Sequence, residues 1–169
     1  YNVRMLVKKS SGIKGIADLQ GKSVATTTGT TSFRLLRQAD RASKLDITNV
    51  PGKDHTESFL LVQGDKAAAF VLDDILLAGQ IANARDPQNY EIVGESLRTE
   101  NQALMLRNDD PAFKQLVDET VSGLMQSGEM EKLYQRWFMS PIAPKGININ
   151  YPLNAETRDA FANPSSKGI

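Results

Sequence analysis

The sequence contains no cysteine, and only one histidine and one tryptophan occur among its 169 residues. The absence of cysteine excludes disulfide bonds, thiolate nucleophiles and cysteine-ligated metal sites. The charge is balanced, with 20 basic and 20 acidic residues, so neither nucleic acid nor an anionic membrane surface is favoured as a partner. No apolar run approaches the roughly 20 residues that span a bilayer. A chain of this length is about the size of one domain and can bury a core.

Several catalytic and nucleotide-binding motifs are also missing. The sequence has no GxxxxGK[ST] loop, no GxGxxG after a predicted strand and no HExxH, so nucleotide and zinc-protease chemistry lack their minimal parts. No serine lies in a GxSxG elbow, which disfavours a Ser-His-Asp triad. We therefore expect no catalytic residue, no metal ligand and no cofactor.

Short apolar segments alternate with helical ones along the chain. This pattern predicts an α/β fold in which helices flank a central, mostly parallel sheet. The expected strands are 4–8, 23–27, 46–50, 67–72, 90–93 and 103–106, and the expected helices are 31–42, 56–63, 74–84, 111–126, 128–138 and a short one at 155–162.

The run from Val24 to Phe33 has the pattern of a buried strand that ends at a glycine turn and leads directly into a helix. Gly29 can adopt backbone angles that other residues resist, and the first amides of the helix have no partners within it. Together with the threonine hydroxyls, these donors suit a carboxylate. The alternative is that the threonines only cap the helix.

Two other polar segments follow predicted strands. Asp73 and Asp74 come after an apolar strand, at the edge where open α/β sheets bind ligands. We assign helix capping to Asp74 and predict that Asp73 faces the ligand. His55 follows Asp54 in a polar stretch, and a solitary histidine is more often a surface or structural residue than a ligand contact.

Four segments together resemble one family, the periplasmic glutamate/aspartate-binding proteins that serve amino-acid ABC transporters (solute-binding protein family 3). They are IADLQGKSVATTTGTTS from Ile16, KDHTESF from Lys53, AAAFVLDD from Ala67 and YEIVG from Tyr90. The resemblance runs through nearly the whole chain. It implies a non-catalytic, periplasmic protein that binds L-glutamate or L-aspartate for uptake, with a membrane-embedded ABC permease as its partner.

The resemblance also implies a role for each candidate site residue. The ligand's α-carboxylate would be surrounded by Thr28, Gly29, Thr30 and Thr31. His55 would meet the acidic side chain of the ligand, since a protonated imidazole gives a charge-assisted hydrogen bond to a carboxylate. Asp73 would hold the α-ammonium, for which a carboxylate is the natural acceptor.

The family is two-lobed, and the resemblance implies how the chain is divided between lobes. Residues 1–8 would form a hinge strand, 9–102 the second lobe, and 103–169 a return hinge strand with helices and a tail that belong to the first lobe. The chain would then be a carboxyl-terminal portion that carries one half of the ligand cleft and lacks most of the first lobe. The family's first lobe also supplies arginines to the ligand.

The apolar faces of the two helices after residue 110 would normally pack on that first lobe. We expect the side chains of Phe113, Leu116, Trp137 and Phe138 either to fold onto the remaining lobe or to form a homodimer, such as a domain-swapped one. Gln102 and Ala103 stand where compared family members have tyrosine and glycine, which affects the second hinge strand.

Two other functions stay open at this point. The same scaffold carries enzymes that resemble cyclohexadienyl dehydratase, and a fold alone does not fix function. The third possibility is a truncated module that no longer binds amino acids and serves in assembly.

Overall fold

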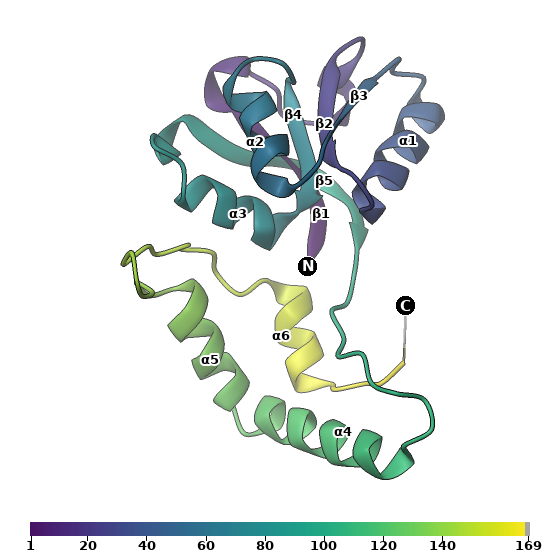
Figure 1. Cartoon of the computed structure of the whole chain (residues 1–169), viewed down its shortest axis with the longest axis vertical. Coiled ribbons are helices and arrows are strands. Elements are labelled where there is room, and N and C mark those ends of the chain that lie inside the picture. The colour runs from purple at the N-terminus through teal and green to yellow at the C-terminus, as the bar shows by residue number, and fades with distance from the viewer. Residues whose placement is uncertain (168–169) are drawn as a thin grey trace. The chain divides into compact units, whose positions relative to one another are not determined.

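The computed structural model describes residues 1–167, which fall into two compact units (Figure 1). One unit runs from Asn2 to Glu100, and the other consists of Tyr1 and the chain from Asn101 onward. The assignment of these parts to two lobes, with hinge strands at 1–8 and after 102, stays a prediction.

The first unit contains one five-stranded sheet in the order β3-β2-β4-β1-β5. Its strands are β1 (Asn2–Lys8), β2 (Ser23–Thr27), β3 (Thr48–Gly52), β4 (Ala69–Asp73) and β5 (Tyr90–Thr99). Its helices are α1 (Thr31–Ser43), α2 (His55–Gln63) and α3 (Asp74–Ala82), with short 3-10 turns η1 (Lys9–Ser11), η2 (Ile16–Leu19) and η3 (Pro87–Asn89).

The predicted α/β class is confirmed, with one correction to the sheet. Strand β2 runs parallel to β3 and β4, whereas β1 runs antiparallel to both of its neighbours, β4 and β5. The sheet is therefore mixed rather than mostly parallel. The sequence pattern misses this because a strand covered on both faces is apolar throughout in either orientation.

Helices cover both faces of the sheet, and side chains alternate between the two resulting cores. Along β4, Ala69 and Val71 point to the core shared with α1, whereas Phe70 and Leu72 point to the core shared with α2 and α3. This alternation follows from the two-residue repeat of a strand. The sheet is thus a two-sided, fully covered scaffold for the loops at its edges.

A bulge interrupts the pairing of β1 with β5. The register shifts between Val3 and Met5. Gly94, at this shift, has φ +80°, in the left-handed region that favours glycine. The Arg4 Nε donates to the Gly94 carbonyl at 2.9 Å. Beyond the bulge β5 continues to Thr99, which pairs with Asn2.

The second unit contains α4 (Pro111–Gln126), α5 (Glu129–Phe138) and α6 (Ala155–Ala162). Asp110 caps α4, because its Oδ1 accepts from the Phe113 amide at 2.9 Å and proline occupies the first turn. Gly128, with φ +80°, holds the cap position of α5, which begins one residue later than expected.

The expected strand at 103–106 is also wrong. This segment has no regular secondary structure, and Met105 is 98% exposed. A strand needs a neighbour for its backbone groups, and β1, the other predicted hinge strand, pairs with β4 and β5 on its two sides. Among residues 1–167, no strand pairs with residues 103–106.

Candidate functional site

The carboxyl ends of three strands meet at one edge of the sheet. Strands β2 and β3 are paired so that Thr27 lies opposite Gly52, and β4, on the other side of β2, ends at Asp73. All six predicted site residues lie where these strands end or where the following helices begin. Thr28, Gly29 and Thr30 form the turn after β2, Thr31 and His55 are the first residues of α1 and α2, and Asp73 is the last residue of β4. A sheet edge of this kind is where open α/β folds bind small ligands.

The turn between β2 and α1 is held by its own threonines. The Thr28 amide and hydroxyl both donate to the Gly52 carbonyl, at 2.9 and 3.0 Å, and the Thr30 hydroxyl donates to the Thr27 carbonyl at 2.7 Å. Gly29 takes φ +79° between them, in the left-handed region that favours glycine.

The first turn of α1 has no side-chain cap. Thr30 occupies the cap position, but its side chain makes no capping hydrogen bond, so the simple capping role that the sequence left open is absent at this residue. The orphan amides at the start of α1 carry the positive end of the helix dipole. A negative charge placed at this turn would be stabilised by these amides.

His55 is the first residue of α2 and is oriented by a buried hydroxyl. Its Nδ1 lies 2.8 Å from Thr27 Oγ1, which in turn lies 2.9 Å from Ser58 Oγ. Asp54 caps the helix through the Glu57 amide at 2.8 Å. With Nδ1 engaged by Thr27, Nε2 is the ring nitrogen available to a ligand.

The two aspartates after β4 divide their roles differently from the prediction. Asp73, not Asp74, holds the cap position of α3, and its side chain makes no capping bond. Asp74 is the first helical residue; it is buried, and its Oδ1 accepts from the Ile75 amide at 2.8 Å. Asp74 thus does satisfy an amide of the first turn, and Asp73 keeps its carboxylate for other partners.

The surroundings of Asp73 disfavour its charged form. Burial first, and then the negative charges of Glu100 and Asp74, raise the pKa of Asp73 to about 6. A cation placed beside this carboxylate would reverse that effect. Perturbed acids of this kind cluster at functional sites.

Glu100 belongs to the same edge and was not predicted. Its Oε2 accepts from the Thr31 hydroxyl at 3.2 Å, and its Oε1 lies 3.7 Å from Arg98 Nε. The expected strand ends at 93, whereas β5 continues to Thr99, so no local pattern predicts that residue 100 lies at the site. Arg4 on β1 donates to the Gly94 carbonyl, and Arg107, in the second unit, pairs with Asp110.

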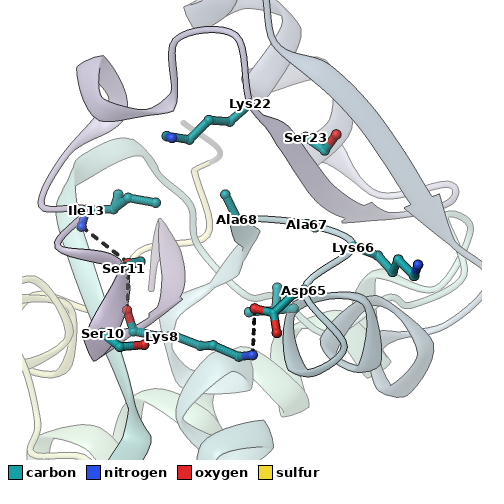
Figure 2. A pocket seen from close by; sticks show the side chains of 11 residues that line it. Lys8, Ser10, Ser11, Ile13, Lys22, Ser23, Asp65, Lys66, Ala67 and Ala68 are labelled. Atoms are coloured by element: carbon teal, nitrogen blue, oxygen red, sulfur yellow. Dashed lines mark hydrogen bonds and ion pairs between the residues drawn. The ribbon is translucent and has the colours of Figure 1, made fainter.

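A hollow of about 560 Å³ lies at the opposite end of the sheet (Figure 2). It is lined by the end of β1, the start of β2 and the segment before β4, and Lys8 pairs across it with Asp65 at 2.8 Å. Figure 2 shows Lys22 on the far side of the hollow from this ion pair. None of the predicted site residues lines it.

Within residues 1–167, no group of three or more histidine, aspartate or glutamate side chains is arranged to hold a metal ion. In the same range, no helix combines the length and the apolar character that crossing a membrane requires.

Comparison with known proteins gives relatives over almost the whole chain. It is 42% identical over 166 residues to a glutamate/aspartate import solute-binding protein of Escherichia coli (strain K12), a match that covers 98% of this chain and 55% of the relative. It is 41% identical over 164 residues to an L-glutamate/L-aspartate-binding protein of Pseudomonas aeruginosa, covering 97% of this chain and 54% of that protein. The chain thus spans about half the length of these relatives, which are transport binding proteins rather than enzymes.

Solved structures agree with these matches. The GluR0 ligand-binding core from Nostoc punctiforme in complex with L-glutamate is 31% identical, with a TM-score of 0.68 over 81% of this chain and 60% of that one. An ancestral arginine-binding protein bound to arginine, at 21% identity and a TM-score of 0.68 over 82% of this chain and 61% of that one, shares the fold. The family model described as "ABC transporter, phosphonate, periplasmic substrate-binding protein" matches residues 1–145. The chain therefore belongs to this family of periplasmic substrate-binding proteins of ABC transporters.

Proposed function

We propose that this chain binds an acidic L-amino acid, glutamate or aspartate, for ABC-transporter uptake in the periplasm, and that it carries one half of the ligand cleft without catalysing a reaction. The observation that carries the proposal is the meeting of three features at one sheet edge. These are the start of α1, which has no side-chain cap, the imidazole of His55, which Thr27 orients, and the carboxylate of Asp73, which makes no capping hydrogen bond.

Each feature suits one group of the ligand. The amides at the start of α1, with the turn at Gly29, suit the α-carboxylate. Asp73 suits the α-ammonium, whose charge would favour the ionised carboxylate that the site otherwise disfavours. The Nε2 of His55 is left for the carboxylate of the ligand side chain.

The negative charge of this half-site indicates that other residues complete the cleft and supply positive charge to the ligand. Asp73, Asp74 and Glu100 bring three carboxyl groups to the edge, and Arg98 already pairs with Glu100. A ligand with two carboxylates therefore needs further positive charge. We propose that it comes from outside residues 1–167, in agreement with relatives of nearly twice the length.

We further propose that an ABC permease receives the ligand and that two copies of the chain associate through α4 and α5. Support for the second point is the apolar surface on these helices, where Phe113, Leu116, Leu133 and Trp137 are all exposed. Sedimentation tests it: a dimer that Leu116→Glu dissociates is expected, whereas a stable monomer of the unmodified chain at high concentration contradicts it.

An amide NMR titration with L-glutamate up to millimolar concentration tests the binding function. Saturable shifts centred on Gly29, Thr30, His55 and Asp73 are expected, and His55→Ala should weaken the response. Absence of any shift would overturn binding by this chain and leave the assembly role. A response to a phosphonate but not to L-glutamate would instead match the wording of the family description, and turnover of arogenate or prephenate would favour a dehydratase.

A further inference from the structure

The carboxyl end of β5 lies at the same end of the sheet as the carboxyl end of β4, because both strands pair antiparallel with β1. On β1, Val3 faces Asp73 of β4 on one side and Arg98 of β5 on the other. Thr99 faces Asn2, and Glu100 is the next residue along the chain. Glu100 therefore follows the end of β5, and β1 lies between this point and the end of β4. The carboxylates of Glu100 and Asp73 therefore arise at the same edge from different strands.

The Glu100 carboxylate is held from two directions. The Thr31 hydroxyl, at the start of α1, donates to Oε2 at 3.2 Å, and Arg98 Nε, on the same strand, lies 3.7 Å from Oε1. Only 12% of the Glu100 side chain is exposed, compared with 38% for Arg98. A carboxylate fixed in this way is oriented before any ligand arrives, which lowers the entropy cost of binding.

Glu100 and Asp73 are close enough for their charges to interact, since the charge of Glu100 is one cause of the raised pKa of Asp73. A cation placed between two carboxylates that repel each other stabilises the charged form of both. An organic ammonium suits such a pair of carboxylates, because its three N–H donors need more than one acceptor.

We propose that Glu100 is a second acceptor for the α-ammonium of the ligand, beside Asp73, and that Thr31 and Arg98 position its carboxylate. This inference rests on the proposed function and adds a specificity-determining residue to it. Glu100 would make the site select α-amino acids over dicarboxylates that lack the amino group. Thr31 would act on both the α-ammonium and the α-carboxylate of the ligand. Its hydroxyl orients the Glu100 carboxylate, and its amide lies in the first turn of α1, which is proposed to bind the α-carboxylate.

The test compares two ligands that differ in the ammonium, L-glutamate and glutarate, on the whole chain. Glu100→Gln keeps the shape and an acceptor for Thr31 but removes the charge, and Glu95→Gln on the same strand is the matched control, since Glu95 is exposed. Loss of one charge-assisted hydrogen bond should weaken L-glutamate binding about tenfold or more. Glutarate binding should be unchanged or tighter, and Glu95→Gln should change neither.

The pH dependence of L-glutamate affinity is a second measurement, and it would not change if Glu100 had only a structural role. Burial, Glu100 and Asp74 raise the pKa of Asp73, and the positive charge of the amino terminus lowers it. Because Glu100→Gln removes one of the raising charges, it should shift the acidic loss of L-glutamate binding to lower pH. Thr31→Val, which removes only the positioning hydroxyl, should weaken L-glutamate binding less than Glu100→Gln does.

The remaining outcomes overturn the inference in distinguishable ways. Equal weakening of both ligands would make Glu100 a structural residue, and tighter binding of both would make it a competitor of the ligand carboxylates. Unchanged L-glutamate binding in Glu100→Gln would remove the residue from the site while leaving the proposed function intact. Failure of the unmodified chain to bind L-glutamate would overturn the proposed function itself.

Discussion

The two units of the chain differ in what their apolar side chains contact. Every buried hydrophobic residue of the described chain except Leu153 lies in the unit that ends at Glu100. Helices α4, α5 and α6 contain no buried residue, and Trp137 on α5 is 50% exposed. Both units have well-marked helices, so local signals are enough to specify a helix, but burial depends on a surface for the helix to pack against.

The comparison predicts its largest effect for a truncation in the core of the first unit. Phe70 is completely buried between the sheet and helices α2 and α3. Phe70→Ala should lower the free energy of unfolding by about 3–5 kcal/mol, through lost transfer energy and the cavity left behind.

The matched variant is Phe113→Ala on α4, whose side chain is exposed. In the monomeric chain, at a concentration too low for two copies to associate, it should cost less than about 1 kcal/mol, in line with surface substitutions away from packed features. Urea unfolding followed by circular dichroism measures both variants. Equal losses for the two would mean that α4 is packed as tightly as the sheet.

A pair of glycine substitutions sharpens the same contrast. A Cβ on Gly52 would lie 2.6 Å from the Ser58 amide nitrogen, so Gly52→Ala should destabilise by about 1–3 kcal/mol through overpacking. It should also weaken L-glutamate binding, because Ser58 and His55 share the contact with Thr27.

Gly123 in α4 is the control, since nothing lies within 4 Å of a Cβ built there. Gly123→Ala should stabilise by about 0.5–1 kcal/mol, through higher helix propensity and a less flexible unfolded chain. Thermal unfolding of the two variants should therefore move in opposite directions, and a loss of stability in Gly123→Ala would show a close neighbour for α4.

Asp73 gives the first unit a pH-dependent stability. Its pKa is raised from 3.8 to about 6, so between about pH 4 and pH 6 the folded chain keeps a proton that the unfolded chain has released. Stability from this group therefore falls as the pH rises through that window. After discounting for solvent screening, Asp73→Asn should stabilise the unliganded chain by about 1 kcal/mol at pH 7.5 and by much less at pH 4.5.

Urea unfolding of the unmodified chain and Asp73→Asn at the two pH values measures this effect. The same variant should bind L-glutamate more weakly at pH 7.5, because it lacks the acceptor proposed for the ammonium. A gain in both stability and affinity would contradict the role given to Asp73.

The smallest effect is expected on the surface of the second unit. Lys132 pairs with Glu129 at 2.6 Å on α5, and both side chains are largely exposed. Lys132→Gln should change the free energy of unfolding by less than about 0.5 kcal/mol, and 0.5 M salt should reduce the difference further. A cost above 1 kcal/mol in urea unfolding would show that α5 is far more constrained than its exposure indicates.

Much of the fold could be predicted where the signal is local. Helix α4 has the expected bounds because Asp110 and Pro111 mark its start. Strand β3 begins two residues later than expected, because Asp46 takes φ 55°, and it extends through Pro51, which an edge strand tolerates. Strand β5 is longer than expected because Gly94 forms a bulge rather than ending the strand.

The site also divides into residues that local signals predict and residues whose position depends on long-range pairing. Residues that come directly after a strand, such as Thr28 and Asp73, could be predicted from their position in the sequence. Glu100 could not, because its place depends on the pairing of β5 with β1 and on a hydroxyl 69 residues earlier in the chain. The strand expected at 103–106 is wrong for a related reason: its apolar residues predict a strand, but a strand forms only where a distant part of the chain pairs with it, and a local pattern does not reveal that pairing.

The contact among His55, Thr27 and Ser58 has a consequence for how the site holds protons. A neutral imidazole accepts the Thr27 hydroxyl hydrogen at Nδ1, whereas an imidazolium donates there and requires Thr27 to turn its hydrogen toward Ser58 Oγ. Ser58 can accept it and still donate to the carbonyl of Thr26 or Asp54. The hydrogen bond between Thr27 and His55 can therefore form in either direction by rotation of one hydroxyl hydrogen, with every heavy atom of the site left in place.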